Sequence, residues 1–209
     1  MLARGITGVS ASKNIVIGIT GGVATGKSTV VSLLRKDFKY FTSADEIARR
    51  IVKPGMPAYK NIIKKFGNRI LSKNGTIDRK ILAAIIFNNP LRRKQLQNIT
   101  HPEIISAMKK NVETFKKKSR IVLFEAPLLF EAGMQKMADV IVAVVSSKKN
   151  QIKRFVNSGH TRADTLRRIK SQLPLKTKIK KADIVIYNDG SLKELKKSVK
   201  ELAAVIKEL

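Results

Sequence analysis

The sequence predicts an α/β fold in which a five-stranded parallel sheet is covered by helices on both faces. Apolar runs of strand length recur along the chain, and segments with helical periodicity separate them. Parallel strands need long crossover connections, so this alternation favours a three-layer α/β/α sandwich with no internal repeat. We expect the five strands at 15–19, 38–42, 121–124, 140–145 and 182–188.

The first predicted strand leads into a glycine-rich turn, Gly21 to Thr29, and a helix follows from Val30 to Asp37. A glycine, four residues and then Gly-Lys-Ser form the phosphate-binding loop (P-loop) pattern. Glycines let successive N–H groups point at phosphate oxygens, and the helix N-terminus adds positive charge. A turn that binds nothing explains the pattern poorly, because Lys-Ser-Thr opening a helix has no evident packing use. We therefore expect the chain to bind a nucleoside triphosphate.

Three side chains are candidates for contacts with the triphosphate and its magnesium ion. Lys27 would reach the β- and γ-phosphates, and the Ser28 hydroxyl would complete the Mg²⁺ shell. Glu125 closes the apolar strand 121–124, where a magnesium-supporting carboxylate of a P-loop protein would lie.

The second strand is followed by Ser43-Ala44-Asp45-Glu46, which opens a helix. Ligands of open parallel sheets gather outside the carboxyl ends of the strands. Asp45 could therefore orient or deprotonate an attacking hydroxyl group. Alternatively, it only stabilises the dipole of the helix.

The region from about 54 to 118 contains no clear strand, and we expect it to be a helical insertion. The predicted helices run from Pro57 to Gly67 and from Asp78 to Phe87, with a third ending near His101-Pro102 and a fourth from Pro102 to about Lys117. Such an insertion could grip a phosphate acceptor, or it could merely cover the sheet. His101 could equally be a capping or core histidine.

Two basic helices follow the fourth strand, Lys148 to Val156 and Arg162 to Gln172, and Asn157–His160 is a flexible break between them. They are typical of a lid that closes over a triphosphate. Two solvated surface helices are the alternative. After the last strand, an amphipathic helix presents its apolar face at Leu192, Leu195, Val199, Leu202 and Ile206.

The composition is strongly basic: 43 Lys and Arg residues against 15 Asp and Glu give a net charge of +28 over 209 residues. This charge indicates attraction of polyanions, including nonspecific nucleic-acid binding, or a lysine-rich proteome whose solvated helix faces carry lysine. The absence of cysteine excludes disulfides and cysteine zinc sites. No apolar run is long enough for a membrane span, and residues 1–14 resemble a loose arm more than a secretory signal. We expect a cytoplasmic protein without a membrane partner.

Beyond the phosphate loop, several further motifs occur along the chain: Ala44-Asp45, Ile47-Ala48-Arg49, Pro54-Gly55, Gly75-Thr76-Ile77-Asp78-Arg79, Ile86-Phe87, His101-Pro102, Pro127-Leu128-Leu129-Phe130-Glu131, Arg168, Gln172, Ala182-Asp183, Asn188 and Gly190. With these motifs in this order, the chain resembles the dephospho-CoA kinase family from about Ile15 to the C-terminus. The resemblance implies a P-loop kinase fold, with a core at 15–53, 119–147 and 182–209, an acceptor-binding insertion at about 54–118 and a lid at about 148–181. The reaction implied is ATP-dependent phosphorylation of the ribose 3′-hydroxyl of dephospho-CoA, with Mg²⁺.

The resemblance also implies roles for individual residues. Asp45 matches the acidic residue at the acceptor hydroxyl, and Arg154 matches a lid arginine that meets the phosphates. Arg79 and His101 fall in the acceptor-binding region. The ATP phosphate loop is matched at Gly22, Ala24, Thr25, Gly26, Lys27, Ser28 and Thr29.

The chain departs from the family pattern at three places. Ser43 stands where the family often has Asp, and Glu125 stands where Asp is usual. A second lid arginine is expected near 157–158, where the chain has Asn and Ser; Lys153 or Arg162 could compensate.

Two other functions stay open at this point. A nucleoside monophosphate kinase shares the architecture, although the Asp78-Arg79 and His101-Pro102 motifs argue against it. A nucleic-acid-binding NTPase would account for the charge, but it predicts a strand that ends in Asp. The sequence does not determine the oligomeric state.

Overall fold

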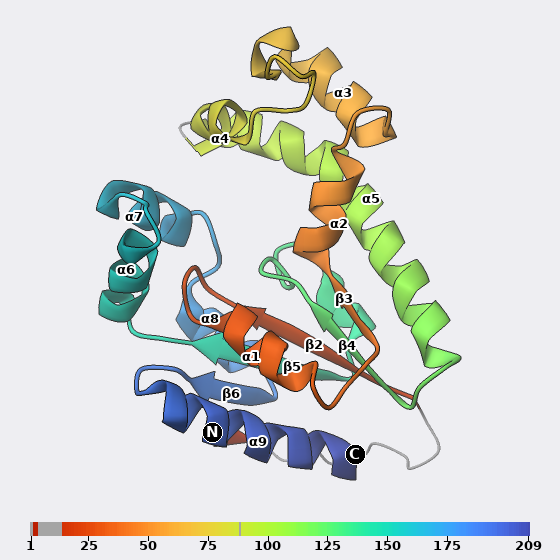
Figure 1. Cartoon of the computed structure of the whole chain (residues 1–209), viewed down its shortest axis with the longest axis vertical. Helices are drawn as coiled ribbons and strands as arrows, with labels where there is room; N and C mark the ends of the chain where they lie inside the picture. The colour runs from red at the N-terminus through yellow and green to blue at the C-terminus, as the bar shows by residue number, and fades with distance from the viewer. Residues whose placement is uncertain (1, 4–13, 88) are drawn as a thin grey trace. The chain divides into compact units, whose positions relative to one another are not determined.

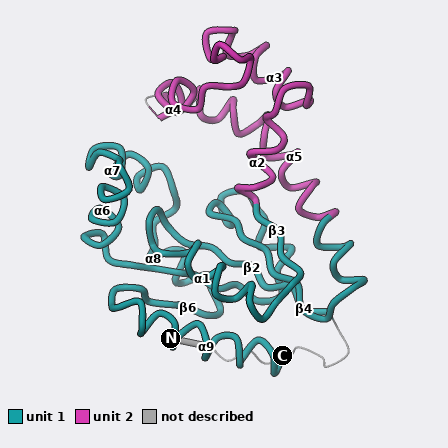
Figure 2. Tube along the Cα trace, viewed as in Figure 1, with its two compact units in different colours: residues 1–43, 111–209 teal, residues 44–110 magenta. Residues whose placement is uncertain are grey.

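The computed structural model describes residues 2–3, 14–87 and 89–209 (Figure 1). The chain divides into two compact units. Unit 1 comprises Met1–Ser43 and Asn111–Leu209, and unit 2 comprises Ala44–Lys110 (Figure 2).

Unit 1 is built on a sheet with the strand order β1-β6-β5-β2-β4-β3. The strands are β1 (Leu2–Ala3), β2 (Ile15–Gly21), β3 (Phe41–Ser43), β4 (Ile121–Glu125), β5 (Val140–Val145) and β6 (Ile184–Tyr187). The five predicted parallel strands are confirmed, and the two-residue β1 adds an antiparallel pairing at the edge of β6. β2 and β5 are buried along their whole length, as the continuous apolar runs predict for parallel strands covered on both faces.

Helices α1 (Lys27–Leu34) and α9 (Leu192–Glu208) pack together on one face of this sheet. Alternate strand residues such as Ile17, Val142 and Ile184 join them in one apolar cluster. The predicted apolar face of the terminal helix is confirmed at Leu195, Val199, Leu202 and Ile206, whereas Leu192 is exposed. A capping box between Ser191 and Glu194 begins α9.

The segment after β4 covers part of the other face. A Cβ on Gly18 of β2 would come within 3.0 Å of the side chains of Leu129 and Phe124. α8 (Leu175–Lys181) also contacts β5. The sequence did not predict this helix, which lies between the second predicted lid helix and β6. The two predicted lid helices are α6 (Lys148–Asn157) and α7 (Arg162–Lys170).

Unit 2 contains α2 (Ala44–Ile51), α3 (Pro57–Phe66), a short 3₁₀ turn η1 (Asn68–Ile70) and α4 (Arg79–Phe87). It also includes most of α5 (Pro90–Lys116), whose last residues belong to unit 1. Its core is a separate apolar cluster formed by Ile62, Phe66, Ile70, Ile77 and Leu82, so unit 2 packs around its own residues.

The prediction that Pro102 separates two helices is wrong, because α5 continues through it. Proline lacks the N–H that would bond to the carbonyl of Asn98, and it disfavours helix at the preceding residue. Apolar residues nevertheless pack on both sides of it: the partly buried Ile99 contacts the core of unit 2, while Ile104 and Met108 are almost fully buried. This burial offsets the loss of one hydrogen bond.

Among the helices of the described residues, none is long and apolar enough to cross a membrane.

Candidate active site

The phosphate loop joins the carboxyl end of β2 to the first turn of α1. β2 pairs with β4 on one side and with β5 on the other, so the loop lies where the strand order reverses. Open α/β sheets bind ligands at such a switch point. Lys27 is buried, whereas Ser28 and Thr29 are exposed in the first turn of α1.

Gly26 gives the loop its conformation. It has a φ of 87° and is the N-cap of α1, and the nearby Ala24 also has a positive φ, at 52°. A Cβ on Gly26 would overlap the side-chain amide of Asn188. Glycine is therefore required both for the left-handed backbone and for space. It also leaves the first amide groups of the helix without a covering side chain, as an anion-binding helix N-terminus needs.

Lys27 and Glu125 form an ion pair, which joins the start of α1 to the end of β4. Both side chains are 9% exposed. The hydroxyl of Ser43, at the end of β3, donates to the other oxygen of the same carboxylate at 3.5 Å. Glu125, predicted as a magnesium-supporting residue, thus lies beside the phosphate-binding lysine, and the structure brings these two candidates together.

Arg154 of α6 contacts the end of β6. Its guanidinium group donates to the backbone carbonyl of Asn188 at 2.8 Å and to the hydroxyl of Ser146 at 3.3 Å. Asn188 in turn donates from its side chain to the carbonyl of Thr25 at 2.8 Å. The predicted lid arginine is therefore linked to the phosphate loop through one asparagine.

Asp189 anchors the start of α6 to the end of β6. Its Oδ1 accepts from the N–H of Ser147, the hydroxyl of Ser146 and the side chain of Asn150, at 2.7–2.9 Å. Burial alone would raise the pKa of this carboxyl group. The hydrogen bonds favour the charged form and outweigh burial, so the pKa falls to about 2.

A second ion pair lies in the interior of unit 1. Lys178 of α8 is fully buried, and its ammonium group donates to the carbonyl of Pro127 at 2.7 Å and contacts Glu131 at 3.1 Å. Burial lowers the pKa of Lys178, and the Glu131 carboxylate opposes that shift. Glu131 also accepts from the N–H of Leu173, so α8 and the segment after β4 are joined by charge-assisted hydrogen bonds.

Helices α6 and α7 pack through a stack of side chains. The rings of Phe155 and His160 lie 4.0 Å apart and nearly parallel, and the guanidinium of Arg168 lies over the opposite helix's Phe155 at 5.3 Å. Lys153 and Arg162, the two candidates to replace a second lid arginine, are both exposed. Their positions leave both side chains accessible to a ligand.

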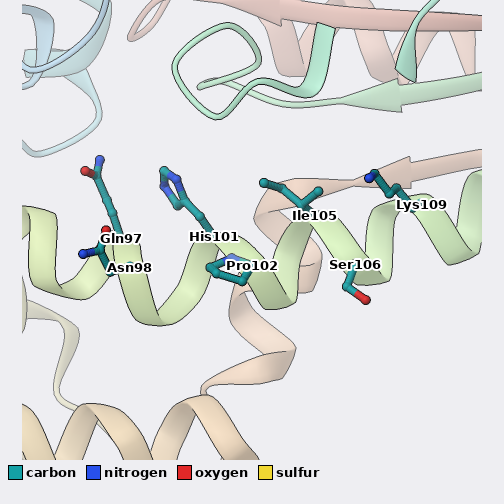
Figure 3. Close-up of a pocket in the computed structure, with 7 residues that line it drawn as sticks. All are labelled: Gln97, Asn98, His101, Pro102, Ile105, Ser106 and Lys109. Carbon is teal, nitrogen blue, oxygen red and sulfur yellow. The ribbon is translucent and has the colours of Figure 1, made fainter. Parts of the chain in front are cut away.

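The predicted acceptor-side residues belong to unit 2. Asp45 is exposed in the first turn of α2, and Arg79 is exposed at the first residue of α4. His101 is partly buried on α5 and lines an open hollow of about 710 Å³ (Figure 3). The other lining residues are Gln97, Asn98, Pro102, Ile105, Ser106 and Lys109.

A family model described as dephospho-CoA kinase matches residues 15–194. The chain belongs to the dephospho-CoA kinase family. Its fold is therefore the P-loop kinase fold that the strand order and the phosphate loop indicate.

Individual members of the family match over almost their whole length. The chain is 41% identical to the dephospho-CoA kinase of Fusobacterium nucleatum over 92% of this chain and 98% of that protein. It is 39% identical to the dephospho-CoA kinase of Carboxydothermus hydrogenoformans over 88% and 90%, respectively. The solved structure of dephospho-CoA kinase from Campylobacter jejuni is 29% identical, with a TM-score of 0.70 over 94% of this chain and 98% of that one.

Sequence patterns alone assign no role to four residues whose side chains join distant segments of unit 1: Glu131, Lys178, Asn188 and Asp189. Glu131 and Asn188 stand in motifs that carry the family resemblance, which was a usable signal. Lys178 follows Leu175 by three positions and precedes Ala182 by four, so helical spacing puts it on an apolar face. Several neighbouring lysines obscure that pattern.

Proposed function

We propose that the protein transfers the γ-phosphoryl group of ATP to the ribose 3′-hydroxyl of dephospho-CoA, which yields coenzyme A and ADP, the last step of coenzyme A biosynthesis. The observation that carries this proposal is the family match over residues 15–194, which includes both the phosphate loop and the helical unit 2. The conformation of the phosphate loop in unit 1 supports the phosphate-binding half of this proposal.

In this proposal the residues Gly22 to Thr29 hold the ATP phosphates. The amide groups of the loop and of the first turn of α1 face the phosphate oxygens, and the open N-cap at Gly26 leaves them accessible. Lys27 lies at the β- and γ-phosphates. Its charge offsets the negative charge on the transferring phosphoryl group, and phosphoryl transfer depends mainly on such positioning and electrostatics.

Asp45 is the proposed general base. It is a carboxylate in the first turn of α2, two positions after the β3 residue Ser43 that contacts Glu125. Its exposure leaves it accessible to an acceptor hydroxyl. We propose that Asp45 orients the 3′-hydroxyl and accepts its proton late in the transfer.

The residues proposed to hold Mg²⁺ are Ser28 and Glu125. Within the described ranges, no group of three or more His, Cys, Asp or Glu residues forms a ready-made cage. Such a cage is not needed, because Mg²⁺ keeps several waters and is held by one or two carboxylates together with phosphates. The exposed Ser28 hydroxyl and the Glu125 carboxylate beside Lys27 fit that mode. The ion would supply charge neutralisation at the β- and γ-phosphates.

Arg154 is the proposed lid arginine. Its guanidinium group is already held close to the phosphate loop through Asn188. We propose that the lid region 148–181 closes over ATP and that Arg154 then stabilises charge on the phosphoryl group.

Unit 2 is the proposed binding region for dephospho-CoA. Arg79 is available for an anionic group of that substrate, and His101 lines the hollow on α5 together with the polar Gln97 and the cationic Lys109. These polar side chains share one face of α5 with the apolar Ile105 (Figure 3), and small-molecule sites combine polar and apolar groups in this way.

The net charge of +28 favours the approach of both anionic substrates. We further propose weak, salt-sensitive binding to nucleic acid, caused by the same charge. A cytoplasmic location is part of this proposal, since the cysteine-free composition gives no indication of an oxidising compartment.

The test of this function is a comparison of phosphate acceptors. ADP release from ATP is measured with dephospho-CoA and, in parallel, with AMP, CMP and UMP at equal concentrations. We expect rapid release with dephospho-CoA alone. Preference for a nucleoside monophosphate would replace the proposal by that of a nucleoside monophosphate kinase, and release stimulated by RNA without any small acceptor would indicate a nucleic-acid-dependent NTPase.

A further inference from the structure

Asn188 follows β6 in unit 1 and contacts both the phosphate loop and Arg154. It is 6% exposed, and its backbone N–H donates to the carbonyl of Val145 at 2.8 Å, which continues the parallel pairing of β5 and β6. The position of its side chain is therefore set by the sheet and not by a free loop.

The side-chain amide of Asn188 is directed at the phosphate loop. Its Nδ2 donates to the backbone carbonyl of Thr25 at 2.8 Å, across 163 positions of sequence. That carbonyl belongs to the peptide between Thr25 and Gly26, the peptide that turns into α1. Gly26 has the positive φ that this turn requires, and it has no Cβ to displace the amide. A hydrogen bond at this peptide fixes the direction of the amide groups that follow it.

The other polar atoms of Asn188 are directed at Arg154. The backbone carbonyl accepts from the guanidinium group at 2.8 Å, and Oδ1 lies 3.5 Å from the same nitrogen. Arg154 also donates to Ser146, whose hydroxyl donates to Asp189. The arginine is thus held by neutral oxygens that an anionic phosphate can replace, because a charge-assisted bond to phosphate is stronger than a bond to a carbonyl.

We propose that Asn188 is a positioning residue for ATP, which holds the Thr25–Gly26 peptide in its phosphate-binding conformation and keeps Arg154 beside the loop. Asn188 acts through these groups and does not itself need to touch the reacting phosphoryl group. This inference rests on the proposed function for its kinetic readout, but nucleotide affinity tests it independently of any acceptor.

The informative variant is Asn188→Asp. It preserves shape and the acceptor for Arg154, but it removes the donor to Thr25 and puts a carboxylate oxygen against a carbonyl oxygen. A matched control is Asn14→Asp, because Asn14 also donates from its side chain to backbone carbonyls, those of Ser119 and Lys116, before the amino end of β2. The two variants make the same chemical change at different places: Asn14 precedes the amino end of β2, whereas Asn188 follows β6 and donates to the loop after the carboxyl end of β2.

The experiment measures ATP dissociation by calorimetry, KM for ATP and for dephospho-CoA, and the thermal unfolding temperature of each protein. We expect Asn188→Asp to weaken ATP binding and raise KM for ATP by tenfold or more, with KM for dephospho-CoA within twofold of the unchanged protein. Asn14→Asp should leave the dissociation constant and the KM for ATP within twofold of those of the unchanged protein. This should hold even where Asn14→Asp lowers the unfolding temperature as much as Asn188→Asp does.

Equal ATP affinities in Asn188→Asp and the unchanged protein would overturn the proposal, as would a loss of affinity that Asn14→Asp reproduces. If Asn188→Asp does not fold, Asn188→Ser is measured instead, since its shorter side chain removes the bond to Thr25 without introducing charge. The same tenfold criterion then applies. If the unchanged protein binds ATP but does not phosphorylate dephospho-CoA, that result refutes the proposed function and leaves the proposal for Asn188 intact.

Discussion

The ammonium group of Lys27 and the carboxylate of Glu125 form an ion pair in which both side chains are 9% exposed. Taking two charges out of water is costly, and a close partner is what makes it tolerable. Glu125 therefore compensates the charge of the lysine that the phosphate loop supplies. In the proposed complex, a phosphate group at Lys27 would add a further negative charge, which Mg²⁺ would offset.

Replacing this lysine should remove the charge that acts on the phosphates. We expect Lys27→Met to lower kcat/KM for ATP by roughly 10²- to 10³-fold, the usual effect of deleting one group that stabilises transition-state charge. Steady-state kinetics with saturating dephospho-CoA measure the change. Lys207→Met is the control, because Lys207 forms an exposed ion pair with Asp37 and should be dispensable. Comparable losses in the two variants would exclude a specific role for Lys27.

Asp45→Asn should separate binding from chemistry. The amide keeps the size of the carboxylate but cannot accept the hydroxyl proton, so we expect kcat to fall by roughly 10²- to 10⁴-fold. Affinity for ATP should stay within about twofold, because the interaction lost is made with the acceptor. Turnover and ATP calorimetry on the same preparation test both statements. A kcat close to that of the unchanged protein would remove Asp45 as the base.

Gly26 and Gly133 allow strain to be distinguished from steric overlap. Both have positive φ, 87° and 70°, but a Cβ on Gly26 would overlap Asn188, whereas a Cβ on Gly133 would meet nothing within 4 Å. Each Ala variant should lose about 1–3 kcal/mol of unfolding free energy to backbone strain. Only Gly26→Ala should also abolish ATP binding, as measured by calorimetry. Unimpaired ATP binding by Gly26→Ala would show that the loop tolerates a side chain there.

The carboxyl group of Asp189 should make stability depend on pH at the acid end. Its pKa in the folded protein is about 2, below the ordinary 3.8, because its hydrogen bonds outweigh burial. A carboxyl group whose pKa is lowered by folding stabilises the folded state at pH values above its unfolded-state pKa. The contribution of Asp189 to the free energy of unfolding is therefore lost as the pH falls from 3.8 towards 2. Urea unfolding should show Asp189→Asn to be less stable than the unchanged protein at pH 7, with a difference that narrows below pH 4. A difference that is constant with pH would mean that the charge of Asp189 is not responsible.

The sheet could be predicted from sequence because parallel strands buried on both faces appear as continuous apolar runs. Pro102 shows the limit of such local rules. Its missing N–H predicts a helix end, but burial of Ile104 and Met108 stabilises the continuous α5. α8 was not predicted because it is short and rich in lysine, and its buried side, including Lys178, depends on contacts with the distant Pro127 and Glu131.

The candidate site, like the fold, could be predicted from the sequence only in part. The phosphate loop could be predicted because its chemistry is contained in nine consecutive residues, Gly21 to Thr29. The contacts of Asn188 and Asp189 could not be predicted, because their hydrogen-bond partners, such as Thr25 and Ser146, are far away in sequence. Only the folded sheet brings those partners together.

The most direct test of the proposed function is the position of the phosphate in the product. The protein is incubated with ATP and dephospho-CoA, and the product is analysed by mass spectrometry and phosphorus NMR. A 3′-deoxy analogue of dephospho-CoA is the matched control. We predict one new phosphate on the ribose 3′-oxygen and no product from the analogue. Phosphorylation at another position, or equal ADP release with both compounds, would contradict the proposed reaction.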